Sequence, residues 1–183
     1  MTDIQKTYTY TLKLYLATVE EPVFVNLREK EKDRFTSILS LFGEDGDSSG
    51  FFVSDTIDGK CIGVNIQLIQ AVNILWEPTV TLDDLTHYDG PIRLLLKNRA
   101  EAIETDTETP DELHEFFTMI DLGPEVSGFF AGFTDLDGEE LLINTDELVY
   151  IEAPSSLIDE GWEIITENDE IMSDELKSDG IDS

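Results

Sequence analysis

This sequence predicts an α+β protein made of two tandem β-rich repeats. The motif Ser49-Gly50-Phe51-Phe52 recurs as Ser127-Gly128-Phe129-Phe130. In each half the motif is followed at similar spacing by an Asp-Gly pair, an asparagine and two aliphatic positions. Each half also contains alternating apolar stretches, typical of half-buried strands, and one stretch with helical periodicity. We therefore expect each repeat to run about β-β-α-β-β-β, with a pseudo-two-fold relation and antiparallel sheets or small β-barrels.

The first repeat begins with residues 7–18, where tyrosine and leucine alternate with threonine and lysine. A turn at 20–22 leads into a short second strand, so the opening predicts a hairpin. Residues 28–42 have apolar side chains three and four positions apart behind a charged first turn, which predicts a helix. A second hairpin turns at Asp58-Gly59, since this pair supplies the positive φ angles of a type I′ turn. One more strand is expected at 69–76.

The second repeat begins with an apolar strand at residue 92 and a weak strand at 102–105. Thr109 is the expected N-cap of its helix, and Pro110 suits the first helical position. The helix sequences align at an offset of 81, the SGFF motifs at 78, and the Asp-Gly and Asn positions at 79. We attribute these differences to loop insertions and a β-bulge in the third strand of a repeat. The predicted divisions are a first repeat at 1–77, a connection at 78–90, a second repeat at 91–165 and a disordered acidic tail at 166–183.

The net charge of −30 is unevenly distributed. Residues 1–42 carry six acids and six bases, whereas residues 101–158 carry sixteen acids and no base. After residue 100 lie 25 of the 30 net negative charges. Charge of this kind bears on partners and solubility rather than on fold.

The sequence offers little for catalysis. It contains two histidines, His87 and His114, and no phosphate-cradling glycine loop, nucleophile elbow or HExxH pair. The sequence around Asp137-Gly138 lacks the anchoring carboxylates of a calcium loop, and Cys61 is expected to be a buried, inert thiol. We therefore expect a protein that is not an enzyme and has no cofactor or metal, without direct contact with nucleic acid or membrane. The absence of a long apolar run or a signal-like N-terminus predicts a cytoplasmic location.

Three functions can account for the acidic second half. The first is an interaction protein that binds a basic protein surface, in its sharper form a nucleic-acid mimic that blocks a DNA- or RNA-binding protein. The others are halophile-type acidic solubility, and a small-molecule-binding sensor with a pocket between the repeats. We favour the first function. The expected partner-binding residues share one stretch without a base: Glu101, Glu104, Asp106, Glu108, Asp111, Glu112, Glu115, Asp121 and Glu125.

Overall fold

The computed structural model describes residues 7–41, 50–79, 88–123 and 130–178. These residues form ten strands, all paired antiparallel, and three α-helices, which confirms the predicted α+β class. The strands are β1 (Thr7–Leu16), β2 (Val23–Arg28), β3 (Phe51–Asp55), β4 (Lys60–Asn65), β5 (Ile69–Thr79), β6 (Ile92–Leu96), β7 (Ile103–Thr105), β8 (Phe130–Thr134), β9 (Glu140–Asn144) and β10 (Leu148–Pro154). The helices are α1 (Glu29–Leu41), α2 (Pro110–Leu122) and α4 (Ser155–Ser178), with a 3₁₀ turn, η1, at Ile66–Leu68.

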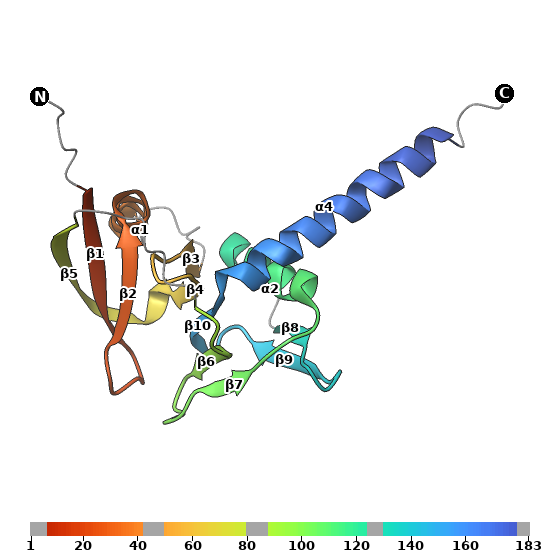
Figure 1. Cartoon of the computed structure of the whole chain (residues 1–183). Coiled ribbons are helices and arrows are strands. Elements are labelled where there is room, and N and C mark those ends of the chain that lie inside the picture. The colour runs from red at the N-terminus through yellow and green to blue at the C-terminus, as the bar shows by residue number, and fades with distance from the viewer. Residues whose placement is uncertain (1–6, 42–49, 80–87, 124–129, 179–183) are drawn as a thin grey trace, which may run out of the picture.

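The two halves of the chain share a central sheet. Its strand order is β3-β4-β10-β6-β7, so the last strand of the chain lies between β4 of the first half and β6 of the second. A second sheet, β2-β1-β5, comes from the first half alone, and β8 and β9 form a separate hairpin. Figure 1 places β5 and the β8–β9 hairpin at opposite ends of the molecule.

The central sheet separates two apolar cores. On one face Phe52, Ile62 and Val64 pack with the β2-β1-β5 sheet and with Phe35 of α1. On the other face Phe51 and Cys61 pack with α2 and the β8–β9 hairpin. Successive strand residues thus enter different cores, because side chains alternate across a strand. The β3–β4 hairpin is therefore buried on one face by its own half and on the other by the second half.

Both tight hairpin turns form where the sequence predicts them, but the expected type I′ geometry at Asp58-Gly59 is wrong, because Asp58 is not among the described residues with positive φ. Gly59 has a φ of 79° and Gly138 a φ of 76°, the left-handed region that glycine adopts without steric cost. Each turn closes through a backbone hydrogen bond, from the N–H of Thr56 to the carbonyl of Lys60 at 2.8 Å and from that of Asp135 to Glu139 at 2.9 Å.

The two C-terminal helices pack against each other through a close contact. α2 begins at Pro110 after Thr109, as predicted. At Gly161 of α4, an added Cβ would lie 2.1 Å from the carbonyl oxygen of Pro110. Glycine is therefore what allows the two helices to approach. The boundary that the sequence predicts between the second repeat and the tail, at residues 165 and 166, falls inside α4.

The strands pair in the same way in each half. β1 pairs with β2 and β5, and β6 pairs with β7 and β10. The pseudo-two-fold part of the prediction has no support in this pairing. If a two-fold axis related the halves, β9 would pair with β5 in the way that β4 pairs with β10. Within the described residues, β9 pairs only with β8 and β5 only with β1.

The expected register of the SGFF motifs is wrong by one residue. Phe51 lies opposite Asn65, and Phe130 lies opposite Asn144, so Phe51 corresponds to Phe130 rather than to Phe129. The structure has no register shift between β3 and β4 or between β8 and β9. The bulge expected in the third strand is therefore absent from these described pairs.

Candidate functional site

A groove of about 960 Å³ lies between the two halves of the chain. Its walls are the β1–β2 connection at residues 18–24, the β6–β7 connection at residues 98–102, and side chains from β4, β6, β7 and β10. Both halves contribute to it, and it is larger than the groove of about 430 Å³ lined by α1, α2 and β3. This makes the groove the candidate site.

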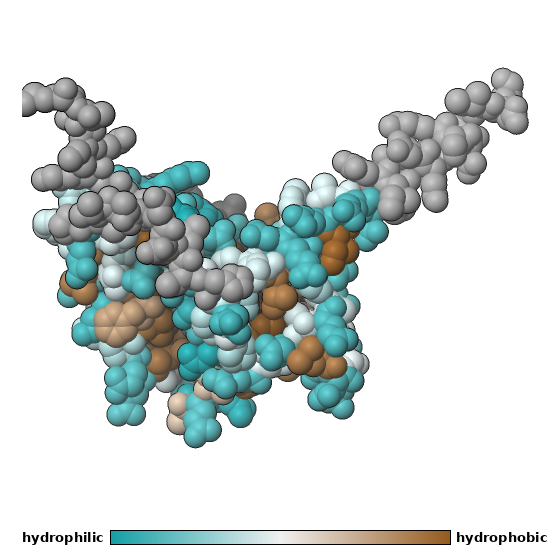
Figure 2. Space-filling view, viewed as in Figure 1, coloured by the Kyte–Doolittle hydropathy of each residue, from teal (hydrophilic) through white to brown (hydrophobic). Residues whose placement is uncertain are grey.

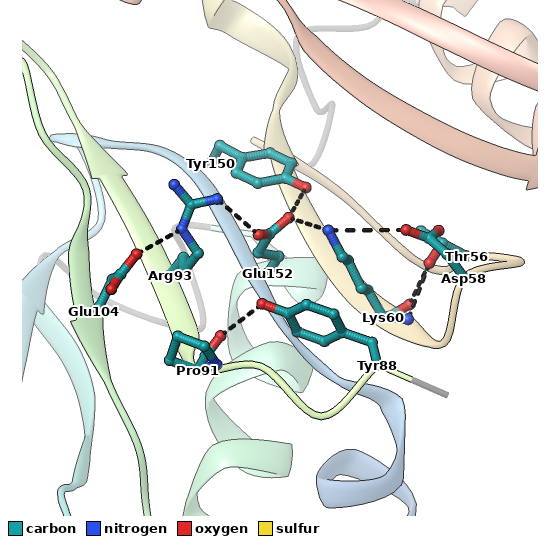
Figure 3. A network of polar contacts seen from close by, with 9 residues as sticks. All are labelled: Thr56, Asp58, Lys60, Tyr88, Pro91, Arg93, Glu104, Tyr150 and Glu152. Atoms are coloured by element: carbon teal, nitrogen blue, oxygen red, sulfur yellow. Dashed lines mark hydrogen bonds and ion pairs between the residues drawn. The ribbon is translucent and has the colours of Figure 1, made fainter. Parts of the chain in front are cut away.

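The buried carboxylate of Glu152 organises the polar wall of this groove (Figure 3). Glu152 is 5% exposed and accepts hydrogen bonds from Lys60 Nζ at 3.1 Å, Arg93 Nη1 at 3.2 Å and the Tyr150 hydroxyl at 2.9 Å. A buried carboxylate requires such partners, because removing the charge from water is otherwise costly.

The sheet order brings these residues together. Glu152 lies on β10 directly opposite Arg93 of β6, while Lys60 lies on β4 at the other edge of β10. Tyr150 is two residues from Glu152 on the same strand, so both side chains project from one face. The network therefore links both halves across the strand that they share.

The network continues towards the rim of the groove. Arg93 Nε lies 3.2 Å from Glu104 Oε1, and the Lys60 ammonium lies 4.6 Å from the centre of the Tyr88 ring. The Tyr88 hydroxyl donates to the carbonyl oxygen of Pro91 at 3.1 Å, as Figure 3 shows. The Arg93 side chain remains 44% exposed, so part of its guanidinium faces solvent.

Burial raises the pKa of the Tyr150 phenol well above its usual value of 10.0, and the negative charge of Glu152 raises it further. Tyr150 therefore stays protonated at neutral pH and donates its proton in a hydrogen bond to Glu152. A carboxylate that accepts hydrogen bonds from three donors is well suited to holding two cations in place. The arrangement fixes the positions of Lys60 and Arg93 on the groove wall.

The structure places the described members of the predicted partner-binding set on the β6–β7 connection, on β7, on the connection from β7 to α2 and on α2 itself. Glu101, Asp106, Glu108 and Glu115 are exposed, and Asp111 is half-buried. Two others form ion pairs, listed with their distances: Glu104 Oε1 with Arg93 Nε at 3.2 Å and Asp121 Oδ1 with Arg34 Nη2 at 3.3 Å. Glu125 lies outside the described residues.

Glu112 has a structural task that the sequence did not reveal. Its Oε2 accepts hydrogen bonds from the backbone N–H of Thr134 at 2.7 Å and from the Thr109 hydroxyl at 3.2 Å. These hydrogen bonds lower the pKa of the Glu112 carboxyl below its ordinary value of 4.5, and the bond from Thr134 has a larger effect than the bond from Thr109. Because the folded pKa is lowered, this stabilisation is present at neutral pH and is lost as the pH falls through the acidic range. Glu112 thus ties α2 to β8.

Cys61 is buried in the core, and His114 packs against α4. Burial raises the pKa of the Cys61 thiol well above its usual value, which keeps the thiol protonated and unreactive. The His114 ring lies with Nδ1 3.1 Å from the carbonyl oxygen of Ile158 and its centre 5.5 Å from that of the Trp162 ring. The second histidine, His87, lies outside the described residues.

Sequence reasoning missed Glu152, Lys60 and Arg93 as a group. One signal was present: Glu152 is the single charged residue in the strand Leu148–Pro154, whose other members are apolar apart from a tyrosine hydroxyl. A lone acid in a fully buried strand requires partners from neighbouring strands. The identity of those partners follows from the strand order, which the sequence does not reveal.

Comparison with protein-family models, with curated proteins and with solved structures finds no match for this chain. In the part of the chain that the structure describes, no cluster of three or more histidine, cysteine, aspartate or glutamate side chains is placed to bind a metal ion. The described helices likewise include none with the length and apolar character needed to cross a bilayer.

Proposed function

We propose that this protein is a non-enzymatic interaction protein whose acidic second half binds a basic protein surface. The observation that carries the proposal is the stretch at 101–158, which holds sixteen acids and no base. Many of these acids are exposed, so their charge faces solvent and potential partners. Such a surface steers the encounter with a positively charged partner and selects against negatively charged ones.

The exposed acids are spread over several elements of the second half. They include Asp137 and Glu139 at the β8–β9 turn, Asp146 and Glu147 before β10, and Glu163 on α4, besides those on β7 and α2. Figure 2 shows hydrophilic side chains over these elements, interrupted by apolar patches. In the sharper form of the proposal, the carboxylates occupy the positions of nucleic-acid phosphates and the partner is a DNA- or RNA-binding protein.

Reversing four exposed acids is expected to abolish binding of the partner while leaving the fold intact. The variant carries Glu101→Lys, Asp106→Lys, Glu108→Lys and Glu115→Lys, and it omits Glu112 because that side chain holds α2 to β8. The protein is immobilised, proteins captured from its source lysate at low salt are eluted by a salt step and identified, and the affinity of the captured protein is measured for both forms. Electrostatic binding should weaken steeply with ionic strength.

The matched control reverses four exposed acids of the first half and connection: Glu20, Glu21, Glu77 and Asp89. It changes the net charge by the same amount and should leave most of the affinity. Equal loss in both variants would mean that net charge alone matters. Capture of only generally basic proteins would instead favour acidic solubility, and a halophilic fold should be stabilised by salt.

We further infer that the two halves are tandem copies of one unit. Equivalent strand pairs support this: Leu14 lies opposite Val23 and Val72, as Leu94 lies opposite Ile103 and Ile151. A register shift interrupts the β1–β5 pair and the β6–β10 pair at equivalent places. In the first half it lies where Tyr15 and Leu16 face Ala71 and Ile69. In the second half it lies where Leu95 and Leu96 face Tyr150 and Leu148.

Local geometry supports the same inference. Thr18 and Asn98, which follow equivalent strands, are the two non-glycine residues with positive φ among those described, at 68° and 60°. The Asn65 side chain accepts from the N–H of Gln67 at 3.1 Å, and that of Asn144 accepts from Asp146 at 3.0 Å. A crystal structure with these pairs out of equivalent register would contradict the inference.

The groove supports a second candidate function, binding of a small anionic ligand. Arg99 is exposed at its wall, close in sequence to the ordered network at Arg93. We expect a panel of small carboxylates and phosphates to contain a ligand that raises the melting temperature. The rise should shrink in Arg99→Ala and persist in Lys97→Ala, a matched cation outside the groove lining. An equal response in both variants would place the ligand elsewhere.

A further inference from the structure

We propose that copies of this chain assemble head to tail, with the β8–β9 hairpin of one copy adding to the free edge of β5 in the next. The proposal rests on the inferred duplication. The chain already contains this contact once, between its own two halves, and among the described residues the two complementary surfaces have no such strand partner.

The internal contact defines what the assembly requires. β4, the second strand of the first hairpin, pairs with β10, and Ile151 lies opposite Gly63. The hairpin also buries one face against the second half, where Phe51 is 5% exposed and packs in one core with Ile120 and Ile151. Strand pairing and face burial occur together.

The β8–β9 hairpin presents the equivalent surface without a partner among the described residues. Phe130, the counterpart of Phe51, is 60% exposed, and Leu142, the counterpart of Gly63, is 57% exposed. Both point away from the core that holds Ala131, Phe133 and Ile143. Large apolar side chains exposed side by side on one hairpin face indicate a contact surface.

β5 presents the complementary edge. Its counterpart β10 pairs on both edges, and all seven of its residues are buried. In the described part of the chain β5 pairs on one edge only, with β1, and Ile74, Leu75 and Trp76 are 38%, 42% and 63% exposed. An exposed apolar edge strand is a template for adding a strand from another chain.

The two surfaces lie at opposite ends of the molecule, so one chain cannot pair them with each other (Figure 1). Figure 2 shows apolar side chains over β1–β2 and near β8–β9, separated by hydrophilic surface. A contact between unlike surfaces generates a ring or an open filament rather than a two-fold dimer. The β5 end also belongs to the less acidic half, since residues 1–100 carry 5 of the 30 net negative charges.

The internal contact also predicts the register. Because Ile151 lies opposite Gly63, their counterparts Val72 and Leu142 should lie opposite each other between chains. Directly paired strand positions are about 4.5–5.5 Å apart between Cα atoms, which suits a disulfide. Leu136, at the tip of the same hairpin and 52% exposed, has no such position opposite Val72 and provides the control.

The test combines sedimentation with cysteine pairing. Full-length protein should form larger species as its concentration rises, and more so at high salt, because screening reduces repulsion between chains of charge −30. Binding of a basic partner has the opposite salt dependence, so failure of one proposal is distinguishable from failure of the other. Leu142→Glu should lower the association constant at least tenfold with unchanged circular dichroism.

For pairing, a chain with Val72→Cys is mixed with a mass-tagged chain carrying Leu142→Cys and mildly oxidised. A mixed disulfide between the two chains is expected, with little formed when Leu136→Cys replaces Leu142→Cys. Protein that stays monomeric at all concentrations and salts would overturn the proposal. So would a Val72→Cys homodimer as the main product, which would indicate pairing of two β5 edges about a two-fold axis.

Discussion

Glu152→Gln is expected to lower the free energy of unfolding by about 3–5 kcal/mol, the usual cost of removing one partner of a buried ion pair. The substitution keeps the size and planar shape of the side chain but removes the charge that compensates Lys60 and Arg93. The loss lies near the lower end because both cations are partly exposed and regain some hydration. Urea denaturation followed by circular dichroism measures it.

Glu104→Gln is the matched control for Glu152→Gln. Glu104 pairs with the same guanidinium at the same distance of 3.2 Å, but its side chain is 59% exposed, whereas that of Glu152 is 6% exposed. An exposed ion pair contributes about 0–1 kcal/mol, so Glu104→Gln should change stability little. Equal losses in the two variants would show that burial does not set the strength of this network.

Gly161→Ala is expected to destabilise the protein by about 1–3 kcal/mol, as overpacking at a tight contact does. The new Cβ would lie 2.1 Å from the carbonyl oxygen and 2.6 Å from the carbonyl carbon of Pro110, and 2.8 Å from the Cβ of His114. These are backbone and near-backbone atoms that cannot rotate away, so α4 must shift from α2. The direction is informative, because the same change in an isolated helix would stabilise it by about 1 kcal/mol.

Two measurements check the Gly161→Ala prediction. Thermal or urea denaturation gives the loss of stability, and fluorescence of Trp162 in a Trp76→Phe background reports undocking of α4, since Trp162 lies against His114. Glu160→Ala, at an exposed position of the same helix, should leave both readouts nearly unchanged. Unchanged or increased stability of Gly161→Ala would contradict the close packing of α4 on α2.

Much of the local structure could be read from the sequence. Alternation of apolar and polar side chains predicted β1, and the Asp-Gly pairs predicted both hairpin turns. Pro110 after Thr109 marked the start of α2. These features are predictable because they depend on residues close in sequence, through side-chain alternation, turn geometry and helix capping.

The candidate site was less predictable from the sequence. The sequence led to a stretch of acids, of which Glu112 is a structural residue and Glu104 and Asp121 are held by arginines. It did not lead to Glu152, whose partners lie 92 and 59 residues away along the chain. Charge content can be counted from a sequence, but the pairing of individual charges depends on which strands are neighbours.

By itself, then, the sequence determined the α+β class, the elements of each half and the concentration of negative charge after residue 100. Only the tertiary structure decided that β10 pairs with β4 of the first half. As a result Phe51 of the β3–β4 hairpin is buried, whereas Phe130 of the β8–β9 hairpin is exposed. The physical reason is that strand insertion depends on the joint burial of two remote apolar surfaces. Local patterns are the same in both halves and cannot specify which edge is filled.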